Sequence, residues 1–580
     1  MFKHRDPEAA ASASVPGKMI ACVTAIVLSC ALAAAAQQPA PEPGAQQIAA
    51  APAAKELTPW PMGDGGPMRY GAYTAAVDAP ALALSWQYTV PPLTHASLEP
   101  IAANGLIFCA VGAKLYALRA RSGEGIWVYT PPIPTGETAT PDFTASPVYG
   151  NGFVYATTSD GTLHVINAQT GTSVQDIDMG ETATSSPAVA DGKLFLGMEK
   201  GAVLAYTLPT TGGSLKPAWT AQVAPGERFS APVSILDGVV YAASGSGKIA
   251  AIDEKSGRVL YAEALNTPIV HAPIPTEAAV YVVSGDRLFS LIKNGLKPTW
   301  VQPFGGEITG APAYANGDLY IVTANGIVYA FNGPAQRAVW AVTLGAGSSP
   351  HTGAIIAGST LIVPTANGHV YAFAAGGDGA GHAKLLWRYV AEAPLSWEYT
   401  HDDTVPDITA RPMVYGSDLF VLSDNGTLSC LSPTAPDDQG PTVENNYPTG
   451  GPYLGSPPPT ISAEIRDPGS GLLSGSLKLS LDGADIQGFN FNPDTMTLTY
   501  TPAHALTDGS HTVEVVVSDN RHNETDAAWS FSINQVQATQ AAEQQNYGGY
   551  GRGRFGRGGG RGRFGRGGGR GGFGRGGGGG

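Results

Sequence analysis

The amino-acid sequence predicts an all-β protein: a ring of small repeated sheets, a β-sandwich and a glycine- and arginine-rich tail. The 580 residues include 76 glycines and 46 prolines but only 14% charged residues, a composition typical of many turns and short strands. A pattern of about four short strands, clearest at residues 310–340, recurs along the chain. A lone sheet of that size cannot bury a stable core, so the copies are expected to pack against one another.

Residues 1–36 are expected to form a secretory signal. Basic residues precede an apolar run, 19–36, that ends in small residues. Cleavage after Ala36 is the favoured interpretation, and an uncleaved membrane anchor or a lipoprotein processed at Cys30 are the alternatives. We therefore predict an exported protein that is periplasmic, cell-surface or extracellular. Residues 37–80 are predicted to be an Ala/Pro-rich linker and lead-in.

Eight copies of the repeat are expected within residues 81–433. Each copy begins with a small residue and usually a proline, and a turn residue, usually glycine, follows five or six positions later. Proline at the head of a first strand fits a sheet edge, because its nitrogen has no hydrogen to donate to a ladder. The pairs are Pro100/Gly105, Pro147/Gly152, Pro187/Gly192, Pro232/Gly238, Pro273/Ala278, Pro312/Gly317, Gly353/Gly358 and Pro412/Ser417.

The fourth strand of most repeats carries an aromatic residue, as at Trp127 and Trp340. The last repeat lacks this strand after Leu431, whereas Trp86 lies in a strand ahead of the first repeat. An N-terminal strand that completes the last sheet closes the ring and removes a free sheet edge. The predicted fold is therefore an eight-bladed β-propeller, residues 81–433, closed by its own N-terminal strand.

The repeats resemble the pyrroloquinoline-quinone-type (PQQ-type) β-propeller repeat. The resemblance rests on segments 119–123, 167–171 and 253–257, which end in Ser-Gly or Thr-Gly, on Gly-x-Leu-x-Ala-Leu strands and on the Trp-Pro-Met lead-in at Trp60. That family includes quinoprotein dehydrogenases and the non-enzymatic assembly lipoprotein of the Bam complex. The resemblance extends to about Leu431 and implies the fold more than an activity. For the alcohol-oxidising members it implies a quinone beneath a disulfide of adjacent cysteines, with calcium held by Glu, Asn and Asp.

The sequence departs from that cofactor pattern. It holds no adjacent cysteine pair, and no Glu, Asn or Asp matches the calcium ligands by motif. Beyond the signal, the cysteines are Cys109 and Cys430, at positions where other repeats carry apolar residues, so two buried thiols are expected. A disulfide is the alternative, because ring closure brings the first and last repeats together. The prediction is a non-enzymatic ring that binds a protein or glycan, without cofactor or metal; a quinoprotein oxidoreductase with PQQ and calcium is the alternative.

Residues just before the first strands are candidates for the channel mouth. Histidines and carboxylates are metal-ligand types, but these come from different blades, so solvated loop residues are the favoured interpretation. The main candidates are His95, His271, His351 and Arg411. The others are Glu99, Thr144, Phe229, Asp402, Asp403 and Asp407.

The pattern changes after the propeller. Residues 434–459 are rich in Pro, Gly and Asn and are predicted to be a linker. Residues 460–535 show longer alternating strands and Asp-Gly turns, which predict a β-sandwich. The stretch 508–531 resembles bacterial Ig-like modules, which implies a spacer or adhesive unit.

Residues 536–580 form a basic tail that is predicted to be disordered, because so much glycine leaves nothing to bury. The formal net charge is −14, and without the eight tail arginines it is −22. In such RGG-type segments guanidinium groups neutralise phosphates and aromatic rings stack on bases. Export favours extracellular DNA, anionic polysaccharide or lipid head groups as partners; nucleic-acid binding in general and a plain spacer are the alternatives. The candidate residues are Arg552, Arg554, Arg557, Arg561, Arg563, Arg566, Arg570, Arg575, Phe555, Phe564 and Phe573.

Overall fold

The computed structural model describes residues 59–73, 77, 82–90, 98–209, 214–345, 348–390, 407–467, 469–473, 475–492 and 495–536. Every named element in these ranges is a β-strand, so the fold is all-β as predicted. Within the same ranges no helix has the length and apolar character needed to cross a bilayer. The predicted signal, most of the Ala/Pro-rich linker and lead-in, and residues 537–580 of the basic tail lie outside the described residues.

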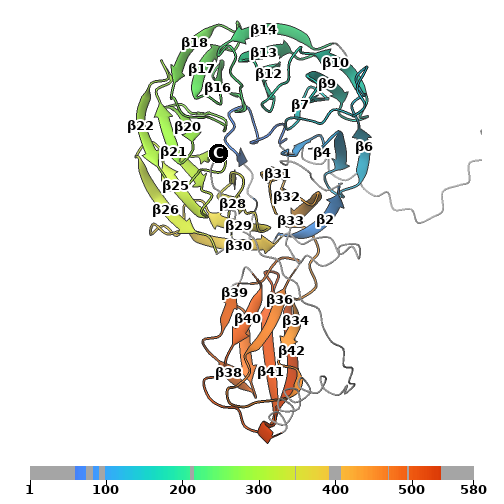
Figure 1. Ribbon diagram of the computed structural model, residues 1–580, viewed down its shortest axis with the longest axis vertical. Coiled ribbons are helices and arrows are strands. Elements are labelled where there is room, and N and C mark those ends of the chain that lie inside the picture. The colour runs from blue at the N-terminus through green and yellow to red at the C-terminus, as the bar shows by residue number, and fades with distance from the viewer. Residues whose placement is uncertain are drawn as a thin grey trace, which may run out of the picture. The chain divides into compact units, whose positions relative to one another are not determined.

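Successive antiparallel sheets surround a common centre and form a β-propeller (Figure 1). The first strands lie nearest the centre: β3 (Ile101–Ala103), β7 (Val148–Gly150), β11 (Ala188–Ala190), β15 (Ser234–Leu236), β19 (Ile274–Pro275), β23 (Ala313–Ala315), β27 (Ile355–Ala357) and β31 (Met413–Tyr415). The second strands are β4 (Leu106–Val111), β8 (Phe153–Thr157), β12 (Lys193–Gly197), β16 (Val239–Ala243), β20 (Val280–Ser284), β24 (Asp318–Val322), β28 (Thr360–Pro364) and β32 (Asp418–Leu422).

The third and fourth strands complete each sheet toward the rim. The third strands are β5 (Lys114–Arg119), β9 (Thr162–Asn167), β13 (Ala202–Thr207), β17 (Lys248–Asp253), β21 (Arg287–Leu291), β25 (Ile327–Asn332), β29 (His369–Ala374) and β33 (Thr427–Ser432). The fourth strands are β6 (Gly125–Tyr129), β10 (Ser173–Asp178), β14 (Lys216–Gln222), β18 (Val259–Ala264), β22 (Pro298–Pro303), β26 (Arg337–Thr343), β30 (Lys384–Val390) and β2 (Ala83–Thr89).

The tight turns between first and second strands follow from the local sequence. Asn104 and Asn316 have φ of 53°, and the glycines after them, Gly105 and Gly317, have φ of 77° and 90°. Asn and Gly tolerate this left-handed region better than other residues. Between neighbouring sheets, buried apolar side chains form shared clusters; Leu163, Phe195 and Val240, from three consecutive sheets, belong to one of them.

The N-terminal strand closes the last sheet of the ring. β2 pairs antiparallel with β33, and Trp86 lies opposite Cys430. Trp86 also reaches into the first sheet, where its indole Nε1 donates to the Ala120 carbonyl at 3.0 Å. The predicted pairing of a strand before the first repeat with the last repeat is therefore present.

The Ser-Gly and Thr-Gly positions of the repeat have a packing role. An added Cβ on Gly171 would lie 2.5 Å from Cδ2 of Trp127, on the fourth strand of the preceding sheet. The Trp127 indole Nε1 donates to the Ala168 carbonyl at 3.0 Å. The pairs Trp86/Gly123 and Trp219/Gly257 show the same close approach. Glycine at these positions lets a tryptophan of one sheet rest on the backbone of the next.

Residues 442–533 form two further sheets. One has the order β34 (Thr442–Tyr447), β36 (Ile461–Arg466), β40 (Thr497–Tyr500) and β39 (Asn490–Asn492). The other has the order β35 (Gly450–Tyr453), β42 (Glu524–Ile533), β41 (Gly509–Ser518), β37 (Lys478–Leu481) and β38 (Ala484–Ile486). Apolar side chains from both sheets, among them Ile461, Leu498, Val515 and Phe531, form a common core, so this part is a β-sandwich.

The predicted linker at 434–459 is partly wrong. β34 and β35 fall inside it and add an edge strand to each sheet of the sandwich. β34 pairs with β36 through an irregular register, and β35 pairs with β42 in parallel at two separated positions. These short strands carry Pro, Gly and Asn, which are normally depleted from strands, so their composition pointed to a linker.

Candidate functional site

The centre of the ring contains the chain's own N-terminal segment. This segment, Trp60–Tyr73, is called the lead-in and is drawn in blue inside the ring in Figure 1. It ends in β1 (Ala72–Tyr73), which pairs in parallel with β27. Before that it crosses the inner strands of several sheets through main-chain hydrogen bonds of 2.7 to 2.8 Å. In each of these bonds a lead-in carbonyl accepts from the main-chain N–H of an inner strand. The four pairs are Pro61 with Tyr149, Pro67 with Ile235, Tyr70 with Tyr314, and Gly71 with Ile356.

Arg69 of the lead-in is fully buried and is held by carbonyl oxygens. Its guanidinium donates to Gly63 O at 2.8 Å, within the lead-in, and to Pro187 O at 2.7 Å. Longer bonds of 3.2 Å reach Ser186 O and Val233 O. Burial lowers the pKa of Arg69, and the charges of two nearby acids partly oppose that shift. The side chain therefore joins the lead-in to two neighbouring sheets.

Arg411 approaches the lead-in from the opposite part of the ring. It is 3% exposed and forms an ion pair with Asp64, which is 7% exposed. Its Nε donates to Ala354 O at 2.9 Å and its Nη2 to Ala311 O at 3.0 Å. The prediction that Arg411 lines a solvated channel mouth is therefore wrong: its charge is neutralised inside the ring by a residue of the lead-in.

Glu99 adds a second carboxylate to this centre. Its Oε2 accepts the Asp64 main-chain N–H at 3.0 Å. Burial raises the pKa of Glu99 to about 7, the negative charge of Asp64 adds to that shift, and Arg411 and Arg69 oppose it. Two acids and two arginines thus share one enclosed space, where each charged group has a partner from the protein itself. We call Asp64, Arg69, Glu99 and Arg411 the central charge network.

Of the predicted histidines, the two that the structure describes, His271 and His351, belong to no metal-ligand group among the described residues. His271 lies near the central charge network, and burial lowers its pKa, while Asp64 and Arg411 act in opposite directions. Its Nε2 lies 3.3 Å from Ile308 O. His351 is exposed, and His95 lies outside the described residues.

The other candidates for the channel mouth that the structure describes are buried or contact residues of the propeller. Phe229 is fully buried in a hydrophobic cluster, so its assignment to the channel mouth is wrong. The hydroxyl oxygen of Thr144 forms a hydrogen bond with the hydroxyl oxygen of Thr157 at 3.2 Å. Burial raises the pKa of Asp407, with a further contribution from Asp424. Asp402 and Asp403 are not among the described residues.

The described residues at the centre do not fit the quinone site that the resemblance implies. Cys109 in β4 and Cys430 in β33 are buried free thiols in one hydrophobic cluster, so the alternative of a disulfide between them is not realised. Burial raises the pKa of both thiols, that of Cys109 to about 12. Asp64 and Glu99 already bind Arg411 and the lead-in backbone. Among the described residues of the ring centre, neither a disulfide of adjacent cysteines nor a set of unpartnered acidic ligands is present.

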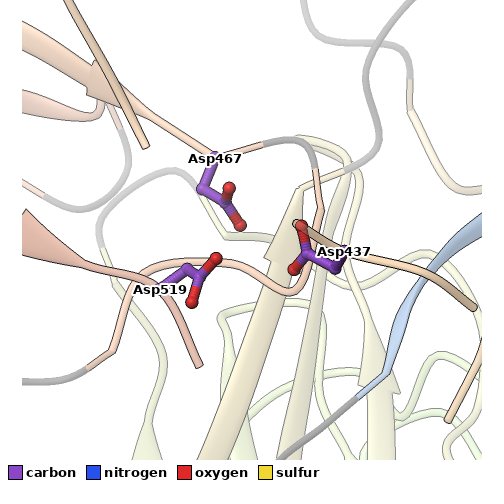
Figure 2. Close-up of side chains that lie close together, drawn as sticks. All are labelled: Asp437, Asp467 and Asp519. Carbon is purple, nitrogen blue, oxygen red and sulfur yellow. The ribbon is translucent and has the colours of Figure 1, made fainter. Parts of the chain in front are cut away.

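A second group of charged residues lies in the sandwich. Figure 2 shows the side chains of Asp437, Asp467 and Asp519 directed toward one another. One carboxylate oxygen from each lies within 4.8 Å of the others. Sequence reasoning missed this group because the three aspartates are far apart in the chain and sit in separate loops. Each aspartate lies in a turn-like stretch, and aspartate is common in exposed turns, so these positions did not stand out in the sequence.

The comparisons with known proteins point to one repeat family. The family profile described as "Outer membrane protein assembly factor BamB" matches residues 70–212, 209–296 and 292–450. The outer membrane protein assembly factor BamB of Yersinia pestis is 28% identical over 235 residues, which cover 38% of this chain and 56% of that protein. The quinohemoprotein alcohol dehydrogenase ADH-IIG of Pseudomonas putida is 30% identical over 236 residues, which cover 37% of this chain and 32% of that protein.

Solved structures support the same fold. The quinohemoprotein alcohol dehydrogenase of Comamonas testosteroni superposes with a TM-score of 0.51 at 14% identity, covering 68% of this chain and 82% of that one. A europium-containing methanol dehydrogenase gives a TM-score of 0.50 at 15% identity, with 63% and 89% covered. At such identities the likeness establishes the propeller fold and leaves the activity open.

Proposed function

The chain belongs to the PQQ-repeat family of the outer membrane protein assembly factor BamB, and from this premise we propose that it is an exported, non-enzymatic binding or scaffold protein. Its propeller is the recognition ring, with a protein or glycan as partner. The ring has eight blades, the eighth completed by β2. The sandwich is an Ig-like spacer, and the basic tail is a polyanion or surface anchor.

The observation that carries this proposal is the content of the ring centre. The lead-in bonds to inner strands around the ring, and the central charge network is satisfied by side chains and carbonyls of the protein itself. Buried charges with protein partners hold a structure together, whereas a catalytic centre needs charged groups directed at substrate or cofactor. Recognition by this ring therefore falls to its outer surfaces and loops.

A quinoprotein oxidoreductase is the alternative, because alcohol dehydrogenases that carry this repeat are among the relatives. Among the residues that the structure describes at the centre, the cofactor-binding set implied by the resemblance is missing, which counts against this alternative. To test the proposal, the purified full-length protein is incubated with PQQ and calcium and then assayed for dye reduction with primary alcohols. We expect no alcohol-dependent rate above the free quinone; turnover that saturates with alcohol would overturn the proposal.

The tail is proposed to bind polyanions through the arginines and phenylalanines between Arg552 and Arg575. Its eight arginines contrast with the acidic remainder of the chain. Each phosphate neutralised on duplex DNA contributes about −0.9 to the slope of log K against log salt. Deletion of 547–580 is therefore expected to abolish both the affinity for DNA and its salt dependence.

A matched variant separates charge from sequence in the tail. Replacement of the eight tail arginines by lysine keeps the charge and should retain the salt slope, whereas replacement by glutamine should remove it. The measurement is a fluorescence titration of labelled DNA at several salt concentrations. Equal affinity and slope for the full chain and the deletion would show that the tail is a plain spacer.

A further inference from the structure

The three aspartates of Figure 2 form an enclosed acidic group at one end of the sandwich. Asp437 precedes β34, Asp467 follows β36 and Asp519 follows β41, so the group joins three separate loops. Asp519 is fully buried and Asp467 is 8% exposed, while Asp437 is partly exposed. Their oxygen atoms lie within 4.8 Å of one another. Carboxylates at that separation repel strongly once water is excluded.

The described residues supply hydrogen bonds to this group but no ion pair. Asp437 Oδ2 accepts the Ser470 N–H at 2.8 Å, and Asp467 accepts the Gly471 N–H. Asp519 accepts main-chain N–H groups at 2.8 Å. None of the ion pairs found among the described residues includes any of the three aspartates. Main-chain N–H groups carry no net charge, so these hydrogen bonds do not neutralise the negative charge of the three aspartates.

Ser470 is an independent sign of a missing partner. Its side chain is 6% exposed, and its Oγ is buried without a hydrogen-bond partner among the described residues. Its main-chain N–H donates to Asp437, and its carbonyl accepts from Asn520 Nδ2, the residue after Asp519, at 2.8 Å. A buried hydroxyl without a partner, on a residue whose main-chain N–H contacts the acidic group, is costly unless a ligand supplies the missing interaction.

We propose that Asp437, Asp467 and Asp519, with the Ser470 hydroxyl, bind a divalent cation, and that this cation is calcium. All four groups offer oxygen, the donor that calcium and magnesium prefer. Calcium accepts six to eight oxygens in irregular arrangements, which suits ligands from three loops, whereas magnesium requires near-octahedral geometry. The ion ties the segment entering the sandwich to the loops after β36 and β41.

The test is calcium binding by the full-length protein after removal of divalent ions with EDTA. Titration calorimetry with calcium chloride should show one saturable site, and a parallel titration with magnesium chloride should show at least tenfold weaker binding. Calcium should also raise the melting temperature. Absence of saturable calcium binding, or equal binding of magnesium, would overturn the assignment to calcium.

Variants locate the ion. Asp437→Asn should weaken calcium binding at least tenfold, because it removes the charge of a partly exposed ligand that also accepts the Ser470 main-chain N–H. Asp438→Asn, at the exposed neighbouring position, is the matched control and should bind like the wild type. Ser470→Ala is the second variant, in case Asp437→Asn fails to fold, and should weaken binding measurably. If Asp438→Asn lost binding as fully as Asp437→Asn, or if Ser470→Ala and Asp437→Asn both bound calcium like the wild type, the site would be refuted.

Discussion

The pair between Arg411 and Asp64 is the residue-scale feature on which the ring centre depends. The two side chains are 3% and 7% exposed and come from positions 347 residues apart. A buried charge that loses its partner remains costly, because water cannot replace that partner. The lead-in and the last blade are therefore coupled through one ion pair.

Replacing Arg411 by alanine should be strongly destabilising. It leaves Asp64 without its cation and the carbonyls of Ala311 and Ala354 without a donor, and we expect a loss of about 3–5 kcal/mol in the free energy of unfolding. The control is Arg119→Ala, which breaks an exposed pair with Glu124 and should cost at most about 1 kcal/mol. Urea unfolding measures both. Similar losses for the two variants would contradict a structural role for the central charge network.

Glu99 should make the stability of the ring depend on pH. Its pKa in the folded protein is about 7, above the ordinary value of 4.5, so the folded state holds the proton more tightly. The resulting stabilisation is complete below about pH 4.5 and is lost as the pH rises through 7. Glu99→Gln, which resembles the protonated acid, should therefore gain stability over the wild type at pH 8 but not at pH 4.5. Thermal unfolding across this range measures the difference, and the exposed Glu124→Gln is the control; parallel curves for Glu99→Gln and the wild type would refute the assignment.

Only part of the central charge network could be anticipated from the sequence. Arg411 stood out because it precedes a first strand, and that position does bring it toward the centre. Its burial could not be foreseen, because its partner Asp64 lies in a segment that showed no strand pattern. The aspartates of the sandwich were missed for the same reason: proximity came from folding, not from spacing along the chain.

At the scale of elements, the contact between a tryptophan and the glycine of the next sheet links the blades. Gly171 has a φ of +70°, and an added Cβ would meet the Trp127 ring. Gly152, in the same sheet, has a φ of +88° but no heavy atom within 4 Å of an added Cβ. Both glycines have a left-handed backbone, but only Gly171 lies against a tryptophan ring.

That difference defines a matched pair of variants. Gly152→Ala should lower the free energy of unfolding by about 1–2 kcal/mol, the cost of placing alanine in a left-handed backbone conformation. Gly171→Ala should cost about 1–3 kcal/mol more, because the Trp127 ring must move. Chemical unfolding followed by tryptophan fluorescence gives both values and reports the ring's environment. Equal losses of stability for the two variants would show that Gly171 is needed only for its backbone conformation and not for packing against Trp127.

Strand patterns were predictable at this scale where they were regular. The Pro-to-Gly spacing and the alternation of apolar residues located the inner hairpins, and the missing fourth strand after Leu431 identified the closing role of the strand at Trp86. β34 and β35 were missed because pairing with the sandwich edges outweighed their unfavourable composition. Tertiary context decided those two strands, as it commonly does for short β segments.

At the scale of the whole molecule, the described residues form a ring with an occupied centre and a sandwich with an acidic group. The lead-in contacts sheets around the propeller, so ring closure involves both the outer strand β2 and the inner segment that ends in β1. The family assignment accounts for the repeat, and relatives of different activity share it. Function on such a scaffold therefore follows from what lies at the centre and on the rim.

The described centre of the ring is occupied by the lead-in and the central charge network, and we therefore propose that it does not take up a quinone. The most direct measurement is equilibrium dialysis of the full-length protein against PQQ with excess calcium, with absorbance recording the bound quinone. We predict no stoichiometric binding at micromolar protein, either for the wild type or for Cys109→Ala. Retention of one quinone per chain would contradict this prediction and would make the oxidoreductase alternative the better description.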